Sequence, residues 1–248
     1  KMDRVGADFP NCITEIREKL GKVAAAIQIP VGVESDFIGM VDLINMKAIL
    51  YTDENLGAKF NISEIPSEYR ESALSYRDKL LETLADFDEE LANDYLEGKE
   101  IDSQRLEKII RTAVIEKNFI PVLCGSAFKN KGVQPLLDAV VKFLPSPIDR
   151  GEITGHSPKD LEKIITRKPS VDDAFSGLAY KIASDPFVGS LTYVRIYSGK
   201  IEEGQTIFNP LKKKKEKINK ILRMHANKRE ERDSASAGDI VALVGLKD

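Results

Sequence analysis

The pattern of apolar residues in this 248-residue chain changes at Pro147, and this change most limits what the chain can fold into. Before Pro147, apolar residues recur at helical spacing or form short continuous runs, which predicts helices mixed with strands. After it, short β-type runs alternate with glycines and predict strands alone. The pair Pro145 and Pro147 ends the last predicted helix, because proline cannot continue one. The fold class is therefore α/β followed by all-β.

Five helices are predicted before Pro147. The first has apolar residues at helical spacing from Phe9 to Leu20, with Asp8 as its N-cap and Gly21 as its end. Three more follow in the acidic interval 62–117. They span Tyr69 to Phe87 with Ser67 near the start, Asp88 to Gly98, and a third begun by Asp102 or Ser103 and running to Val114. The last covers Val133 to Phe143.

Strands are predicted between these helices. Val23–Pro30 and Ile38–Leu50 are β-leaning runs with turn residues between them, and Phe119–Cys124 is an apolar run suited to a buried strand. The second part starts with a polar linker, 151–175, and continues as a small β-barrel over 176–248. Its predicted strands are Leu178–Ala183, Leu191–Ser198, Gln205–Asn209, Lys217–Met224 and Ile240–Val244.

Charge is distributed unevenly along the chain. The net charge of −3 comes from 37 basic and 40 acidic residues and excludes a strongly basic protein that coats nucleic acid. Residues 1–150 carry 19 basic and 26 acidic side chains, whereas residues 151–248 carry 18 and 14.

No apolar run approaches the roughly 18 residues of a membrane span. Cys12 and Cys124 form no disulfide framework, and neither histidine has a zinc-ligand spacing to them.

Two short motifs carry the candidate chemistry, residues 1–3 (Lys-Met-Asp) and residues 125–127 (Gly-Ser-Ala). The second follows a predicted buried strand, and ligands of open α/β sheets bind at the carboxyl ends of strands. The Asp3 carboxylate could accept hydrogen bonds from guanine N1 and N2. The Lys1 stem could lie along the base, and the Ala127 N–H could donate to guanine O6. Adenine would leave that donor unpaired at a cost of about 1–3 kcal/mol.

Ordinary explanations compete with this hypothesis. A Lys-x-Asp triplet is common, and Ser-Ala after a strand usually forms a turn with a capping hydroxyl. The motifs alone therefore leave guanine recognition as one hypothesis among several.

Longer strings resemble the translation elongation factor G family, and the resemblance is weakest in 52–66 and 148–175. Residues 1–8 resemble its NKxD element from the Lys onward, and residues 119–147 resemble its SA element and closing helix. Residues 185–189, 191–199, 223–227 and 237–239 resemble turns and the first hairpin of its second domain. The resemblance implies a ribosomal translocase, a GTPase that moves tRNA and mRNA through the ribosome.

The resemblance also implies the domain plan. Residues 1–150 would be the C-terminal part of a P-loop-type GTP-binding domain, with an α+β insert over about 23–117. Residues 176–248 would be a translation-factor β-barrel that lacks its last strands. The implied guanine-binding residues are Lys1, Met2, Asp3, Ser126 and Ala127.

The chain has no Gly-x-x-x-x-Gly-Lys-Ser/Thr phosphate loop, and no residues match the family's switch regions. We therefore expect a central fragment that lacks catalytic and metal-binding residues and carries no bound cofactor. GTP or GDP with Mg²⁺ would be bound by the full-length parent, which would be the active GTPase.

Partners are implied in the same way. The resemblance implies that the acidic interval 62–117 would contact stalk proteins of the large ribosomal subunit, whereas the residues by themselves favour a solvated acidic helical face. The basic residues Lys212, Lys213, Lys214, Lys215 and Arg223 would contact rRNA phosphates, or would only protect an exposed strand edge. Contact with tRNA and mRNA would be indirect. We expect a monomer without membrane contact, in a bacterial cytoplasm rather than an organelle matrix.

Two alternatives stay open. One is a closely related paralogue devoted to ribosome recycling, which the sequence does not separate from an elongation factor. The other is a stand-alone ribosome- or rRNA-binding module with a vestigial nucleotide pocket.

Overall fold

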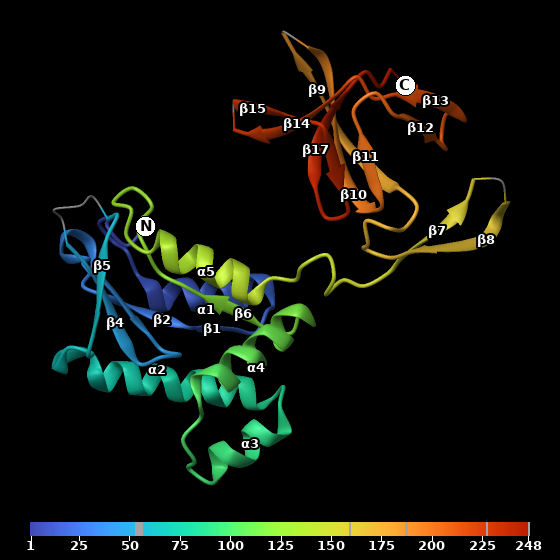
Figure 1. Ribbon diagram of the computed structural model, residues 1–248. Helices are drawn as coiled ribbons and strands as arrows, with labels where there is room; N and C mark the ends of the chain where they lie inside the picture. Colours follow the sequence, from blue (N-terminus) through green and yellow to red (C-terminus); the bar gives the residue numbers. More distant parts are fainter. Residues whose placement is uncertain (53–56, 159, 187, 227, 248) are drawn as a thin grey trace. The chain divides into compact units, whose positions relative to one another are not determined.

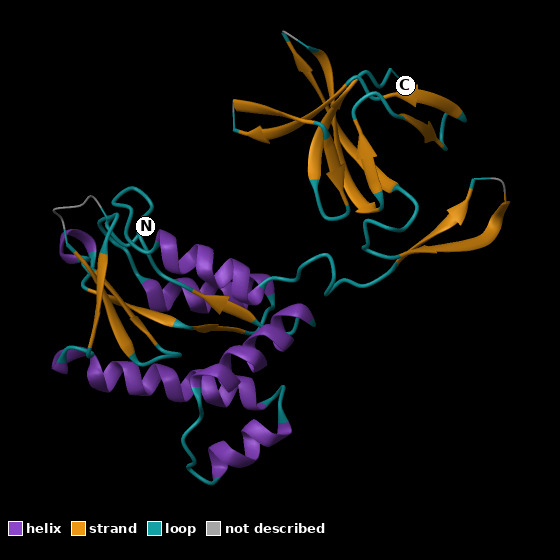
Figure 2. Ribbon diagram, viewed as in Figure 1, coloured by secondary structure: helices purple, strands orange, loops and turns teal. Residues whose placement is uncertain are grey.

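A computed structural model describes residues 1–52, 57–158, 160–186, 188–226 and 228–247 (Figure 1). Phe187 and Asn227, both within the strings that resemble the second domain, lie outside the described residues. The chain divides into two compact units, Lys1–Leu144 and Pro145–Asp248. The division falls at the first proline of the predicted boundary, and helices occur in the first unit while the second is built of strands (Figure 2).

The first unit contains helices and strands in mixed order. They are α1 (Phe9–Leu20), β1 (Ala24–Ala26), β2 (Gln28–Val31), the 3-10 turn η1 (Glu34–Asp36), β3 (Gly39–Asp42), β4 (Lys47–Tyr51), β5 (Phe60–Ser63), α2 (Ser67–Ala85), α3 (Glu89–Leu96), α4 (Ser103–Ile115), β6 (Ile120–Val122) and α5 (Val133–Phe143).

Helix ends follow the capping signals in the sequence. Asp8 accepts a hydrogen bond from the Asn11 N–H at 2.9 Å, and Gly21 ends α1 in the left-handed region. Asp88 and Asp102 cap α3 and α4 in the same way. These side chains satisfy N–H groups that a helix leaves without partners, so the predicted helix starts are confirmed.

The run Val23–Pro30 passes from one sheet to another. Within it, β1 pairs in parallel with β6, whereas β2 pairs antiparallel with β3 in the four-stranded sheet β2-β3-β4-β5. Ile27 joins the two sheets, because its N–H donates to Val122 O and its carbonyl accepts from Leu43 N, both at 3.0 Å. Each of the β-leaning runs 23–30 and 38–50 therefore contains two strands.

The four-stranded sheet lies between α2 on one side and α5 on the other (Figure 1). Consecutive residues of β3 are buried, so both faces of the sheet are covered there, and the fully enclosed Val41 pairs with Ile29 and Ala48. The core of this unit also contains Leu80, Leu84, Leu91, Leu106 and Ile110 from α2, α3 and α4.

The half-buried Arg77 joins α2 to two loops. One guanidinium nitrogen donates to the carbonyls of Leu43 and Ile44, and the other donates to Ile101 O at 3.0 Å. Burial lowers the pKa of Arg77, although its ordinary value is so high that the group stays charged. Arg77 therefore links the β3–β4 turn to the start of α4.

The second unit contains a five-stranded sheet and three two-stranded ones. Its strands are β7 (Ile153–Ser157), β8 (Asp160–Arg167), β9 (Ser176–Asp185), β10 (Gly189–Ser198), β11 (Lys200–Glu202), β12 (Thr206–Asn209), β13 (Lys214–Lys217), β14 (Lys220–His225), β15 (Lys228–Arg232), β16 (Ser234–Ser236) and β17 (Ile240–Val244). The sheets have the orders β15-β14-β17-β10-β9, β11-β16, β12-β13 and β7-β8.

A core of β-branched and leucine side chains holds this unit together. It includes Ile196 from β10, Ile218 and Ile221 around β14, and Leu243 from β17, all nearly inaccessible to solvent. The interval 151–175, predicted as a linker from its polar composition, contains the β7–β8 hairpin. Cross-strand hydrogen bonding does not require apolar side chains, so composition alone missed it.

Replacing Arg77 by Met should lower the free energy of unfolding of the first unit by about 2–4 kcal/mol, because three carbonyls lose a charged donor. Denaturation in urea followed by far-UV circular dichroism at 222 nm measures this, since the helices of the described residues lie in that unit. Arg70→Met, at an exposed position of the same helix, is the matched control and should change stability little. Equal stability of the two variants would contradict the assigned role.

Candidate functional site

The two motifs singled out from the sequence meet in the first unit. The Met2 N–H donates to the carbonyl of Gly125 at 3.1 Å. The Met2 side chain is buried in the core at 6% exposure, and so fixes the position of its neighbours. Lys1 and Asp3 therefore lie beside the loop that follows β6, as the sequence hypothesis required.

Asp3 and Ser126 interact through their side chains. A hydrogen bond from the Ser126 hydroxyl holds the pKa of Asp3 below its ordinary value, and desolvation opposes the shift without cancelling it. The same hydroxyl oxygen accepts from the Lys129 N–H at 3.1 Å, and Ser126 is only 1% exposed. Ser126 thus holds an ionised carboxylate at a defined place in a loop.

The loop after β6 is closed by its own backbone. Ser126 and Lys131 exchange two hydrogen bonds, at 2.8 and 2.9 Å, as an isolated antiparallel bridge. Gly132 has φ +90, and a Cβ there would lie 2.9 Å from the Cys124 carbonyl. A side chain at this position would therefore open the loop.

Ala127 lies at the exposed tip of this loop. Within the described part of the chain, its backbone N–H donates to no acceptor, while its carbonyl accepts from Asn130 N at 3.1 Å. The Lys1 side chain is also exposed. One edge of the site therefore offers a carboxylate with spare acceptor capacity, and another offers an N–H donor. This donor and acceptor set fits the N1, N2 and O6 edge of guanine.

Glu34 in η1 also holds the first loop, which is formed by residues 1–6, and no sequence motif had singled this residue out. Its N–H donates to Met2 O at 2.8 Å, and its carboxylate accepts from the Gly6 N–H at 2.7 Å. Glu34 adopts φ 55, which is uncommon for a residue with a side chain. A turn residue 28 positions away along the chain gives no pattern that would reveal this contact.

The basic residues proposed for rRNA contact fall on two different sheets. Lys212 and Lys213 lie in the turn between β12 and β13, and Lys214 and Lys215 begin β13. Arg223 lies in β14 of the five-stranded sheet. All five side chains are exposed, and the four lysines share one hairpin.

The acidic interval is partly neutralised by internal ion pairs. Asp94 contacts Arg105 at 2.5 Å and Lys99 at 2.9 Å, and these partners lower its pKa. Glu71 and Asp78 on α2 remain exposed, although Asp78 accepts from the Tyr95 hydroxyl at 2.8 Å. Exposed carboxylates outside these pairs lie on α2 and also around α3, at Asp86, Glu89, Glu100 and Asp102.

The described residues give little support for a metal site, a membrane-spanning helix or a reactive cysteine. They contain no group of three or more His, Cys, Asp or Glu side chains placed to hold a metal. None of the described helices combines the length and the apolar character that a membrane crossing needs. Cys124 is buried directly before the Gly-Ser-Ala loop, and desolvation raises its pKa to about 12, so it is not a ready nucleophile.

Each of the two units matches a protein family named for elongation factor Tu. Residues 1–146 match the family described as "Elongation factor Tu GTP binding domain", and residues 189–248 match "Elongation factor Tu domain 2". Proteins named elongation factor G from two strains of Anaplasma marginale, Florida and St. Maries, are each 52% identical over 247 residues. The chain is covered completely but spans only 36% of each of these relatives.

A solved structure shares the fold. The crystal structure of a protein from Thermus thermophilus superimposes with a TM-score of 0.71 at 25% identity. The match covers 98% of this chain and 35% of that protein.

Replacing Ser126 by Ala should raise the pKa of Asp3 toward its ordinary value, because the hydroxyl stabilises the ionised carboxylate. The lowered pKa of Asp3 means that this stabilisation is present at neutral pH and is lost as the pH falls through that pKa. Titration of the side-chain carboxyl carbon by NMR measures the change. Ser63→Ala, at the exposed end of β5, should leave it unaltered. An unchanged Asp3 pKa in Ser126→Ala would remove the basis for this pairing.

Replacing Glu34 by Ala should speed amide hydrogen exchange at Gly6 by about 10–100-fold, the equivalent of losing one hydrogen bond to a charged group. Glu34→Gln keeps an acceptor and should show a smaller change. Asp36→Ala, in the same turn, should show none, since the Asp36 side chain contacts Ser35 rather than the first loop. Equal exchange rates of the Gly6 amide in Glu34→Ala and the unaltered chain would show that the loop does not depend on the Glu34 hydrogen bond.

Proposed function

The chain belongs to the elongation factor family of GTP-binding proteins, and from this we propose that it is the central segment of a ribosomal translocase GTPase. Its first unit would supply the guanine-recognition part of the nucleotide domain, and its second unit the translation-factor β domain. The observation that carries the proposal is the meeting of residues 1–3 with the Ser126 loop, two motifs far apart in sequence.

Base recognition follows from the chemistry of these groups. The Asp3 carboxylate accepts from guanine N1–H and the N2 amine, and the Ala127 N–H donates to O6. The Lys1 stem covers the face of the base, while Met2 and Ser126 hold their neighbours in position. Hydrogen bonds to a charged acceptor are worth about 1.5–3 kcal/mol each, so loss of one changes affinity roughly 10–100-fold.

Phosphate binding and hydrolysis depend on residues outside this chain. The sequence contains no phosphate loop, whose backbone N–H groups and Lys hold the phosphates in P-loop GTPases. Mg²⁺, when bound in the parent, would neutralise charge that develops on the phosphates. We infer that the chain alone neither binds GTP tightly nor hydrolyses it, whereas the parent does both.

Contacts with the ribosome are proposed for two surfaces. The lysine hairpin at residues 212–215, with Arg223, suits rRNA phosphates. Its exposed cationic groups would neutralise phosphates and so release the counterions condensed on the RNA. The acidic interval 62–117, with exposed carboxylates on α2 and around α3, suits a basic surface on the large-subunit stalk proteins. The parent would act as a monomer in a bacterial cytoplasm, and a ribosome-recycling translocase is the alternative function.

Nucleotide selectivity of the full-length parent tests the proposal. Inosine diphosphate lacks the N2 amine of guanosine diphosphate, so Asp3 should favour the guanosine ligand. Asp3→Ala should weaken guanosine diphosphate binding about 100-fold and bring the affinities for the two nucleotides close together. Asp86→Ala, exposed at the end of α2, should bind both as the unaltered protein does.

Isothermal titration and fluorescence with labelled nucleotides measure both affinities. Unchanged selectivity in Asp3→Ala would contradict the assignment of the base-reading residue. Micromolar binding of guanosine diphosphate by the 248-residue chain alone would contradict the proposed dependence on an outside phosphate loop.

A further inference from the structure

Lys131 is a buried lysine at the end of the loop that carries Ser126 and Ala127. Only 4% of the residue is exposed. Its Nζ atom donates a hydrogen bond to the Phe37 carbonyl at 3.2 Å, and Phe37 is itself fully inaccessible to solvent. Burying an ammonium group is costly unless its N–H donors find acceptors. The contact with Phe37 therefore helps to offset the burial of this lysine.

The two halves of Lys131 hold two different segments together. Its backbone exchanges two hydrogen bonds with Ser126, at 2.8 and 2.9 Å, and so closes the loop. Gly125 lies close against it, because a Cβ on this glycine would be 2.8 Å from the Lys131 carbonyl oxygen. Its side chain reaches Phe37 in the connection between β2 and β3. Lys131 therefore ties the loop to the four-stranded sheet.

The β2–β3 connection leads back to the first loop. The Phe37 N–H donates to the Glu34 carbonyl at 3.4 Å, and the Glu34 N–H donates to the Met2 carbonyl at 2.8 Å. Met2 in turn donates to Gly125 at 3.1 Å. These contacts close a ring that joins the two motifs. The Lys131 side chain makes one bond of the ring, and every other hydrogen bond in it joins two backbone groups.

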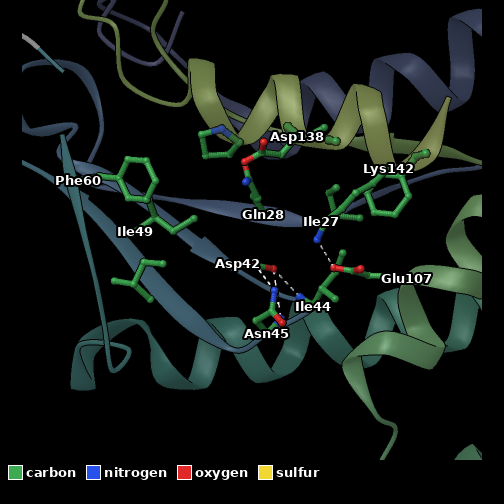
Figure 3. Close-up of a pocket in the computed structure, with 15 residues that line it drawn as sticks. Ile27, Gln28, Asp42, Ile44, Asn45, Ile49, Phe60, Glu107, Asp138 and Lys142 are labelled. Carbon is green, nitrogen blue, oxygen red and sulfur yellow. Dashed lines mark hydrogen bonds and ion pairs between the residues drawn. The ribbon is translucent and has the colours of Figure 1, made fainter. Parts of the chain in front are cut away.

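The helix that follows the loop leaves space against the sheet. α5 begins two residues after Lys131. Figure 3 shows a cavity of about 200 Å³ between this helix and the four-stranded sheet, lined by Gln28 and Ile49 from the sheet and by Ala139 and Phe143 from the helix. Close packing is what normally fixes one element against another. A tie ahead of the helix therefore matters for the position of the loop.

We propose that Lys131 is a positioning residue for base recognition. By tying residues 125–131 to the β2–β3 connection, it keeps the Ser126 hydroxyl within reach of Asp3 and the Ala127 N–H aligned for guanine O6. The second of these effects rests on the proposed function, whereas the first is a property of this chain alone. Lys131 acts through Ser126 and Ala127 and does not itself touch the nucleotide.

Lys131→Met keeps a side chain of similar length and removes its ammonium group, which tests the tie in the 248-residue chain. Hydrogen exchange of the Ser126 amide should become at least about tenfold faster. NMR titration of the Asp3 carboxyl carbon should show its pKa moved toward the ordinary value, because the Ser126 hydroxyl that lowers this pKa is displaced. Lys108→Met, at an exposed position of α4, is the matched control and should change neither quantity.

A merely structural lysine would give a different result. Lys131→Met would then speed exchange throughout the core of the first unit and leave the Asp3 pKa at its lowered value. That result, or exchange of the Ser126 amide at the unaltered rate, would overturn the proposal.

The unaltered chain provides a second measurement, which does not depend on the folding of a variant. The ammonium protons of Lys131 should exchange with solvent at least about tenfold more slowly than those of Lys108, because they are buried and hydrogen-bonded. Equal exchange rates at the two lysines would overturn the proposal.

Nucleotide binding by the full-length parent separates this inference from the proposed function. Lys131→Met should weaken guanosine diphosphate binding about 3–10-fold, the range for weakening one neutral hydrogen bond. Lys131→Arg keeps a charged donor and should bind more tightly than Lys131→Met. Weakened binding by Asp3→Ala with unaltered binding by Lys131→Met would overturn the role of Lys131 and leave the proposed function standing. Unaltered binding by both variants would overturn base recognition and, with it, the part of Lys131 in it.

Discussion

The backbone hydrogen bond from Met2 to Gly125 is the interaction on which the candidate site depends. It joins the beginning of the first unit to the loop after β6, and the buried Met2 side chain prevents the two from sliding apart. Ser126 then reaches Asp3, and Glu34 holds the other side of the first loop. A site that reads a base needs such fixed positions, because hydrogen-bond selectivity falls quickly with misplaced donors and acceptors.

Glu34 connects the loop of residues 1–6 to the sheet formed by residues 28–63. It lies between β2 and β3, so the strands predicted as an insert contribute a direct contact to the first loop. Ile27 adds a second connection, since it hydrogen-bonds to both the β1–β6 pair and the four-stranded sheet. The strands predicted as an insert and the remainder of the first unit therefore contact each other directly.

Acidic and basic side chains gather on different parts of this chain. The acidic interval contains its own ion pairs at Asp94, Lys99 and Arg105, and its exposed carboxylates are spread over α2 and the residues around α3. The lysines of residues 212–215 lie on one exposed hairpin of the second unit. A net charge of −3 averages these two surfaces and describes neither.

Local chemistry within the sequence determined the helix starts at Asp8, Asp88 and Asp102 and the change of fold class near Pro145, because capping, periodicity and proline geometry act over a few residues. Tertiary structure alone decided which strands pair, the β7–β8 hairpin, the Glu34 hydrogen bond to the first loop and the buried contact of Lys131 with Phe37. These depend on contacts between distant positions, and a side chain that serves such a contact has no local pattern to mark it.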